Sequence, residues 1–214
     1  LNGYNYEYLQ QVAQYTNWRY QFVFGSWSQL DAQLKAGQID ILGNIGKIPG
    51  RENEYSFCAY PNGSKRMQLV CLQKNKQFSY DDFTAFKDAS VATMTSPFVM
   101  MQLEELQKER QLNFKYYFYA TNNDVIAALE DGTADLAMLS DMNDLANCKI
   151  VYQWEKTPFY FVVNKEKPQI LAELNAAMKM LQSADRFLEE RLFRRYFGNN
   201  QNSMGLSLTS EEQA

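Results

Sequence analysis

Histidine is absent from this chain of 214 residues. Without an imidazole, neither a Ser-His-Asp nor a Cys-His catalytic arrangement is available. The three cysteines show no close C-x-x-C spacing, so the usual ligand sets of zinc are lacking as well. We therefore predict no catalytic residue, no metal site and no cofactor.

Cysteine is scarce, and an odd count of three is not a disulfide framework. Cys58 and Cys71 flank a turn-like segment at 60–64 and can pair across it. In the alternative interpretation, the cysteines are small buried hydrophobic residues.

Excess positive charge and long apolar runs are also missing. The net charge is -4 and the pI is near 5.0, which gives no electrostatic footprint for nucleic acid or for an anionic membrane surface. The apolar runs are far shorter than the roughly 18 residues of a membrane span. What is present, 46% hydrophobic residues in 214, is enough for one large domain or two small lobes.

Helix-like and strand-like patterns alternate along the chain, which predicts an α/β fold. Ser26 or Ser28 is expected to cap a helix that ends at Gly37, a residue that adopts positive φ at little cost. The other expected elements are helices over about 4–15, 97–111 and 168–197, the last with a break near 183–185, and strands over 19–24, 39–43, 68–72, 90–94 and 114–119.

One local pattern occurs twice at a constant offset. The same 95 positions separate Gly37 from Gly132 and Asp40 from Asp135, and four expected elements keep this offset. Two lobes with one topology are the simplest explanation. The strand at 90–94 has no counterpart ahead of the first helix. We therefore expect that the first strand of lobe one is missing and that the chain begins inside its natural domain.

The repeat also predicts the domain organisation. Lobe one is expected to combine 1–88 with 156–198, and lobe two, 89–155, is inserted into it. Two connections between the lobes would then form a two-stranded hinge. The segment 199–214 is polar and is expected to be a tail or linker.

Several motifs together resemble a known family. These are the S-W pair that opens a helix, the G-x-I-D strand, the P-x-R-x-x-x-Y-S-F loop and the terminal helical segment after 170. They are similar to the family 3 extracellular solute-binding proteins, the amino-acid-binding type of periplasmic binding protein. The likeness covers nearly the whole chain and implies a two-lobe fold of the type II periplasmic-binding-protein kind.

The resemblance implies ligand-binding residues in lobe one. An aromatic residue at the position of Trp27 packs on the ligand in the family, and an arginine at the position of Arg51 pairs with the ligand carboxylate. The loop that contains Asn44 and Gly46 supplies hydrogen bonds. The alternative interpretations are a core role for Trp27, a simple turn at Asn44 and Gly46, and a surface salt bridge from Arg51 to a nearby glutamate, either Glu52 or Glu54.

In lobe two, the resemblance implies ligand contacts from Thr95 and Ser96, which otherwise only cap the following helix. The family usually carries an acid five positions after the aspartate of its last G-x-x-D strand, where it holds the ligand amino group. Counted from Asp135, that position is Ser140, and the acid is Asp141. In one interpretation, Asp141 holds the ligand amino group after a one-residue shift. In the other, Asp141 is a solvated loop acid and the ligand is not a free amino acid.

Two segments, GYNYEYLQQVAQYTNWRYQFVFGSW and FYFVVNKEKPQILAELNAAM, resemble sensor domains of membrane-bound histidine kinases and diguanylate cyclases. The ending LSLTSEEQA is similar to linkers that join one such module to the next segment. The leading hypothesis is an extracellular or periplasmic sensor module, tethered to the membrane, that closes on an amino-acid-like or carboxylate solute and signals to an attached transmembrane segment. The alternatives are a substrate-binding protein that serves an ABC permease, a degenerate interaction domain that no longer binds, and an enzyme on the same fold.

Overall fold

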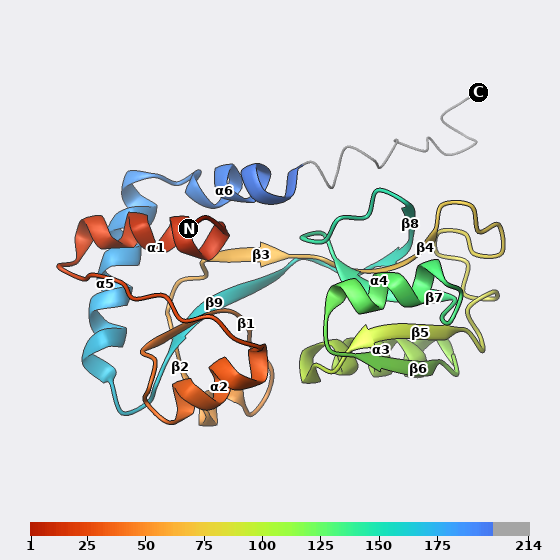
Figure 1. Ribbon diagram of the computed structural model, residues 1–214, viewed down its shortest axis with the longest axis horizontal. Helices are drawn as coiled ribbons and strands as arrows, with labels where there is room; N and C mark the ends of the chain where they lie inside the picture. Colours follow the sequence, from red (N-terminus) through yellow and green to blue (C-terminus); the bar gives the residue numbers. More distant parts are fainter. Residues whose placement is uncertain (199–214) are drawn as a thin grey trace. The chain divides into compact units, whose positions relative to one another are not determined.

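The computed structural model describes residues 1–198, and the predicted tail at 199–214 lies outside the described residues (Figure 1). The chain divides into two compact units. The first comprises Leu1–Lys65 and Thr157–Tyr196, and the second is built around Arg66–Lys156. Each unit has its own sheet with helices packed on it, so the predicted α/β, two-lobe fold class is confirmed. No helix within 1–198 has the length and apolar character needed to cross a membrane.

The sheet of the first unit is organised around one long strand, β9. Its partners β1, β2 and β3 all pair with it in antiparallel fashion. The elements of this unit are α1 (Tyr4–Val12), the short 3₁₀ turn η1 (Ala13–Tyr15), α2 (Trp27–Lys35), β1 (Ile41–Gly46), the 3₁₀ turn η2 (Arg51–Asn53), β2 (Ser56–Phe57), β3 (Gly63–Lys65), β9 (Thr157–Val163), α5 (Pro168–Ala184) and α6 (Leu188–Phe197).

The start and end of α2 follow from local sequence. Ser26 is the N-cap, and its hydroxyl accepts the Gln29 N–H while the Gln29 side chain accepts the Ser26 N–H. This reciprocal capping box satisfies two N–H groups that the helix cannot pair itself. After the last turn, Gly37 has φ 72° and donates its N–H to the Leu34 carbonyl. Both predicted helix signals are confirmed.

The segment over 19–24 is not a strand, contrary to the prediction. Its side chains do alternate: Trp18, Tyr20 and Phe22 are half-buried, and the residues between them are exposed. A strand also needs a neighbour that pairs with its backbone. Within 1–198, no strand pairs with this segment.

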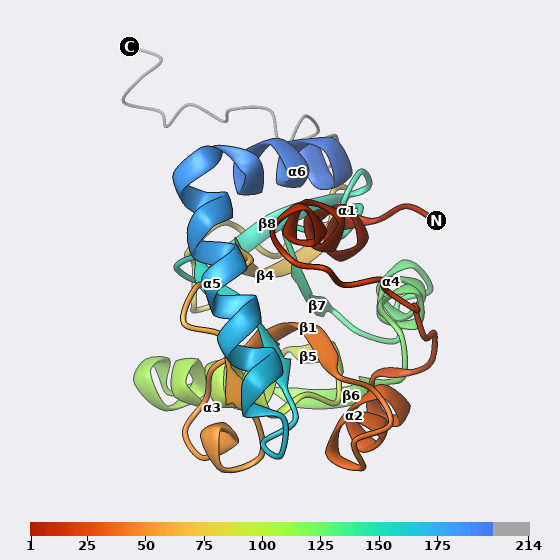
Figure 2. The ribbon, with the colours of Figure 1, turned by 90° about the vertical axis from the view of Figure 1, so that its left-hand side faces the viewer.

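Helices α1, α5 and α6 pack together in the first unit (Figure 2). The predicted break in the last helical region is confirmed, because α5 ends at Ala184 and α6 starts at Leu188. Glu7 of α1 accepts hydrogen bonds from Arg195 at 2.6 Å and from the Tyr196 hydroxyl at 2.7 Å, which fasten α6 to α1.

The second unit contains a five-stranded sheet in the order β6-β5-β7-β4-β8. The strand β5 lies between β6 and β7 and is parallel to both, whereas β4 is antiparallel to β7 and β8. Helices α3 and α4 cover opposite faces of the sheet (Figures 1 and 2). The elements are β4 (Met67–Leu72), β5 (Ser90–Met94), α3 (Pro97–Arg110), β6 (Lys115–Tyr119), α4 (Asn122–Glu130), β7 (Leu136–Ser140) and β8 (Cys148–Gln153).

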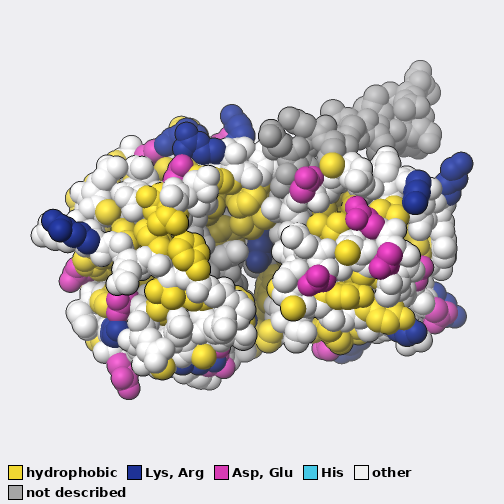
Figure 3. Space-filling view, viewed as in Figure 1, with side chains coloured by type: hydrophobic (Ala, Val, Ile, Leu, Met, Phe, Trp, Pro, Cys, Tyr) yellow, Lys and Arg dark blue, Asp and Glu magenta, His cyan; other side chains and the backbone are white. Residues whose placement is uncertain are grey.

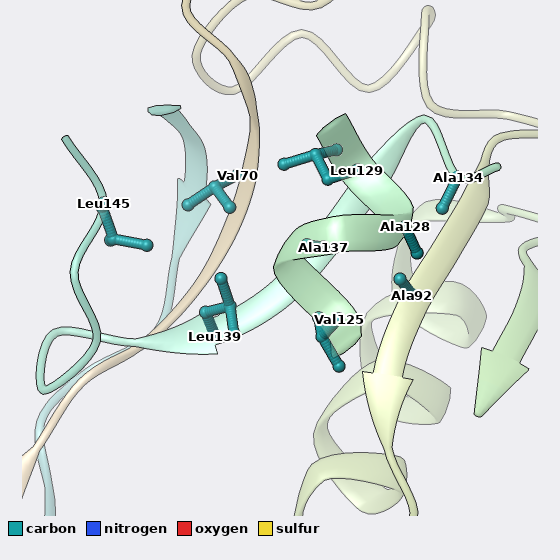
Figure 4. Packing of buried hydrophobic residues seen from close by; sticks show 9 residues of the cluster. All are labelled: Val70, Ala92, Val125, Ala128, Leu129, Ala134, Ala137, Leu139 and Leu145. Atoms are coloured by element: carbon teal, nitrogen blue, oxygen red, sulfur yellow. The ribbon is translucent and has the colours of Figure 1, made fainter. Parts of the chain in front are cut away.

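The hydrophobic core between α4 and the sheet stabilises this strand arrangement of the second unit. Val125, Ala128 and Leu129 point from the helix toward side chains of β4, β5 and β7 (Figure 4). Val70 and Ala137 are fully buried in the same cluster. Small alanines let the helix lie close to the sheet, and dense packing of this kind supplies most of the unit's stability.

The boundary between the units differs from the one expected. Residues 66–88, which we assigned to lobe one, lie in the second unit. The reason is strand pairing, because β4 bonds to β7 on one side and to β8 on the other. The chain returns to the first unit at Thr157.

All three cysteines are free thiols, with Cys58 and Cys71 buried and Cys148 half-buried. Burial raises the pKa of the Cys58 thiol to about 12 and that of the Cys148 thiol to about 11, because a buried thiolate loses its hydration. The three side chains therefore remain protonated hydrophobic residues.

Candidate functional site

Arg51 is held in place by two contacts in the first unit. It opens the turn η2 after Gly50, whose φ is 89°. Its Nη1 donates to the Gly46 carbonyl at 3.0 Å, and its guanidinium carbon lies 5.7 Å from the centre of the Trp27 ring. Trp27, Gly46 and Arg51 thus come together, although they are separate in sequence. Trp27 is 47% exposed, so the interpretation of this residue as core is wrong.

No acidic side chain among the described residues pairs with the Arg51 guanidinium. Within residues 1–198, it forms no salt bridge. Glu54 instead pairs with Lys35 at 3.0 Å. The alternative of a surface salt bridge to Glu52 or Glu54 is therefore wrong. An arginine that is fixed in position and lacks a carboxylate partner presents an anion-binding fork.

Asn44 has an unusual backbone in β1. Its φ is 65°, a left-handed value that asparagine tolerates better than most residues, and the pairing of β1 with β9 shifts register between Leu42 and Ile45. A Cβ at the neighbouring Gly43 would lie 2.8 Å from the Asn5 Nδ2 atom and 2.9 Å from the Phe161 ring, so these side chains would have to shift. The bulge re-aims the chain just before Gly46, and strained backbone of this kind is frequent at functional sites.

Sequence reasoning missed an aromatic pair beside this cluster. The Lys47 ammonium lies 4.2 Å from the centre of the Tyr160 ring and 5.6 Å from that of Phe57. Lys47 follows Gly46 directly in sequence, whereas Tyr160 carried no signal because it lies on β9, far along the chain. An open pocket of about 490 Å³ lies beside the Lys47 side chain, and its lining includes Lys47, Tyr55 and Phe57.

The four candidates of the second unit follow two neighbouring strands. Thr95 and Ser96 come after β5, and Ser140 and Asp141 lie at the end of β7. Because β5 and β7 are parallel, these residues share one edge of the sheet, where ligands of α/β proteins commonly bind. Ser96 is the N-cap of α3, but its side chain makes no capping hydrogen bond. The hydroxyl is therefore not committed to the helix.

Ser140 and Asp141 have different environments. Ser140 is tied into a local turn, where its N–H and its hydroxyl both donate to the Asn143 Oδ1 atom at 3.0 and 3.1 Å. Asp141 is buried and accepts the Arg66 N–H at 3.0 Å. Burial raises the pKa of Asp141, although the hydrogen bond from Arg66 N–H and the charge of Lys156 oppose this. The interpretation as a solvated loop acid is wrong.

Metal chemistry finds no support in the part of the chain that the structure describes. No group of three or more acidic or cysteine side chains there is arranged to hold an ion.

The fold agrees with comparisons to known proteins. The model of bacterial extracellular solute-binding proteins, family 3, matches residues 1–199. The chain belongs to this family. Proteins of family 3 are generally binders without enzymatic activity, and they act outside the cytoplasm. No curated protein matches the sequence of this chain.

Solved structures share the fold at low sequence identity. A putative L-cystine ABC transporter from Listeria monocytogenes covers 92% of this chain and 87% of its own, with 20% identity and a TM-score of 0.76. A histidine kinase sensor domain covers 92% and 86%, with 18% identity and a TM-score of 0.76. An ancestral arginine-binding protein bound to arginine covers 92% and 88%, with 16% identity and a TM-score of 0.74.

Proposed function

We propose that the first unit binds the carboxylate of a small, amino-acid-like solute through Trp27, Asn44, Gly46 and Arg51. The observation that carries this proposal is the Arg51 guanidinium, which is fixed by Gly46 and Trp27 and lacks a carboxylate partner among the described residues. One nitrogen is used by the Gly46 carbonyl, and the remaining donors of the fork suit a planar carboxylate.

Lys47 supports the same chemistry. It is a second cation close to Gly46 in sequence, and its side chain is positioned by Tyr160 and Phe57 rather than by an acid. A cation above an aromatic face keeps its charge available to an anion. The exposed face of Trp27 offers flat apolar surface to the uncharged part of the solute.

In the second unit, we propose Asp141 as the acid for an ammonium group, with Thr95, Ser96 and Ser140 as hydroxyl contacts. The hydrogen bond from the Arg66 N–H holds the Asp141 carboxylate in one orientation, so the carboxylate is preorganised for a cation. The raised pKa of Asp141 fits this role, because an arriving ammonium would compensate the burial of the negative charge.

For the role in the cell, we propose an extracellular sensor module tethered to a membrane-bound signalling protein. The shared fold with a histidine kinase sensor domain supports it. The likeness to a putative L-cystine ABC transporter keeps a second candidate, a solute-binding protein that delivers to a permease. Ligand-dependent kinase output in cells that carry the full-length gene supports the sensor. Ligand uptake that depends on this protein, without such output, contradicts it.

The binding proposal is tested by a thermal-shift screen of amino acids and small carboxylates, followed by calorimetry on the hits. A solute that binds only the folded chain raises its melting temperature. In Arg51→Ala, we expect binding to weaken by about 2–5 kcal/mol, because a desolvated carboxylate loses its charged partner. Arg51→Lys is expected to recover only part of this loss, since an ammonium cannot form the planar fork.

The matched control is Arg186→Ala. Arg186 also lies over an exposed aromatic ring, 5.3 Å from the centre of Phe187, but it is not among the candidate site residues. Its removal should leave affinity unchanged. Equal affinity in Arg51→Ala and the unmodified chain would overturn the proposed site. A complete screen without any hit would favour the interaction domain, and turnover of a hit would favour an enzyme.

A further inference from the structure

Lys47 and Arg51 are close in sequence, and each is positioned by different aromatic rings. The Arg51 guanidinium carbon lies 5.7 Å from the centre of the Trp27 ring. The Lys47 ammonium lies 4.2 Å from the centre of Tyr160 and 5.6 Å from that of Phe57. These two rings meet edge to face, with their centres 6.0 Å apart. The first unit therefore presents two separate points of attachment for anionic groups.

Lys35 shows how a neighbouring cation is neutralised within the chain. Its ammonium also lies beside an aromatic ring, 5.4 Å from the centre of Tyr55. In addition, it forms salt bridges to Asp31 at 3.1 Å and to Glu54 at 3.0 Å. Hydrogen bonds to Glu54 and Asp31 raise the pKa of Lys35. Within 1–198, the two cations described above form no salt bridge of this kind.

The basic side chains of α6 are also paired with acids. On the face of the first unit that Figure 3 shows, basic side chains gather over this helix. Its salt bridges join Arg191 to Asp185, Arg194 to Glu190 and Arg195 to Glu7. These arginines therefore offer a solute less uncompensated charge than Lys47 and Arg51 do.

The pocket beside Lys47 has room for the carbon chain of a solute. It is open and holds about 490 Å³, and Ile48, Pro49 and Phe57 contribute apolar surface to its lining. Small-molecule sites commonly combine apolar walls with a few polar groups that fix the orientation of the ligand. A single cation beside apolar walls suits a carbon chain that ends in a carboxylate.

Glu52 also lines this pocket, and its charge opposes a second carboxylate. Its Oε1 atom accepts the Gly50 N–H at 3.3 Å, and no salt bridge joins it to Lys47 among the described residues. Removal of this negative charge should therefore strengthen the binding of a diacid. A lysine with a purely structural role would not produce this effect.

We propose that the first unit selects a solute with two carboxylates, one held by Arg51 and the other by Lys47, such as a dicarboxylic amino acid. This inference rests on the proposed function, because it takes the carboxylate clamp of Arg51 as given. Lysine carries a point charge on a flexible stem and needs no planar geometry, so it can reach the far end of the solute. Lys47 is exposed, so water screens the contact and its share of the affinity is about fivefold.

The test uses two matched solute pairs, glutamate with glutamine and aspartate with asparagine, measured by calorimetry. Each pair differs only in a carboxylate that is replaced by a neutral amide of similar shape. We expect one diacid to bind about fivefold more tightly than its amide. Lys47→Met should abolish this preference and leave the affinity for the amide within about twofold. Lys47→Arg should retain the preference, and Glu52→Gln should increase it.

The matched control is Lys115→Met. Lys115 also lies beside an aromatic ring, 5.2 Å from the centre of Tyr117, but it belongs to the second unit. Its removal should leave both affinities unchanged. The preference for the diacid should shrink as the salt concentration rises from about 0.05 to about 0.5 M, because salt screens an exposed pair.

The outcomes separate this proposal from the carboxylate clamp on which it rests. If Arg51→Ala weakens every solute while Lys47→Met weakens diacid and amide equally, the clamp stands and the selection of a diacid is overturned. Binding of the amides alone, or of neither diacid, overturns it as well. A preference for the diacid that persists unchanged in Lys47→Met also overturns the role of Lys47.

Discussion

Among single residues, Asp141 shows how burial and a backbone contact combine. Its Oδ1 atom accepts the Arg66 N–H, and the Asp141 N–H donates to the Arg66 carbonyl, so the residue closes the end of β7 onto the start of β4. The side chain is therefore structural in the free protein as well as a proposed ammonium partner. The two roles can be separated by substitutions that keep or remove the oxygen.

We expect Asp141→Ala to lower the free energy of unfolding by about 1–3 kcal/mol, because the Arg66 N–H loses its acceptor. Asp141→Asn keeps an oxygen at this place and should be at least as stable as the unmodified chain at neutral pH. Chemical denaturation of the three proteins measures this. Equal destabilisation by alanine and asparagine would show that the hydrogen bond is unimportant.

The same comparison has a pH dependence with a definite sign. Because burial raises the pKa of Asp141, the folded chain holds this proton at pH values where the unfolded chain has lost it. Stability relative to Asp141→Asn should thus decrease as pH rises from about 4, the unfolded value, through the raised folded pKa. A difference that does not vary with pH would contradict this.

Candidate residues within a short motif could be recognised from the sequence, whereas contacts between residues from separate elements could not. The P-x-R-x-x-x-Y-S-F motif identified Arg51 as the anion-binding candidate, but nothing local indicated that its nitrogen bonds to Gly46. The Tyr160 contact with Lys47 depends on the pairing of Ile45 with Tyr160 across β1 and β9. Such a contact follows from strand register, which the motif does not contain.

At the scale of elements, α2 depends on its first turn. The Ser26 cap satisfies the Gln29 N–H, and most of the helix surface is exposed, with Leu34 as its buried residue. A helix with so little burial gains much of its stability from its ends. Since Trp27 is the first residue of this helix, the cap also positions the Arg51 cluster.

We therefore expect Ser26→Ala to reduce the free energy of unfolding by about 1 kcal/mol. Ser28→Ala is the matched comparison, because the exposed Ser28 hydroxyl lies 3.2 Å from that of Ser26 but does not itself cap the helix. Ligand affinity should fall in Ser26→Ala if α2 frays and Trp27 loses its position. Thermal denaturation and calorimetry measure both effects, and identical results for the two serines would refute the role of the cap.

Helices were more predictable than strands for a physical reason. Caps and stop signals are local, so Ser26, Gly37 and the break near Ser183 could be recognised in the sequence. The segment at 19–24 has the alternation of a strand, yet it lacks a pairing partner in the described chain. A strand requires backbone hydrogen bonds to a neighbouring strand, and the sequence of a segment does not show whether such a neighbour is present.

For the molecule as a whole, the repeat provides a matched pair of core residues. Leu34 of α2 and Leu129 of α4 are 95 positions apart, and they are 0% and 2% exposed. We expect each leucine-to-alanine substitution to cost about 2–5 kcal/mol. Leu34→Ala should speed hydrogen exchange chiefly in the first unit, and Leu129→Ala chiefly in the second. Equal acceleration throughout both units would show that they open as a single cooperative unit.

The two-unit organisation was predictable from the repeat, but the boundary near residue 66 was not. The strand β4 follows the first-unit segment in sequence, and its apolar residues fit either sheet. Its place is decided by hydrogen bonds to β7 and β8, which come about 70–80 residues later. Sequence continuity therefore assigned 66–88 to the wrong unit.

The position of Trp27 gives the protein an optical property. Its indole is 47% exposed and has the Arg51 guanidinium nearby, so the electric field on the ring depends on what neutralises that charge. The other two tryptophans, Trp18 and Trp154, lie beside tyrosines rather than beside this cation. With those two replaced by phenylalanine, the emission of the remaining indole becomes a label-free signal of anion binding, built into the chain at the residue that the solute would touch.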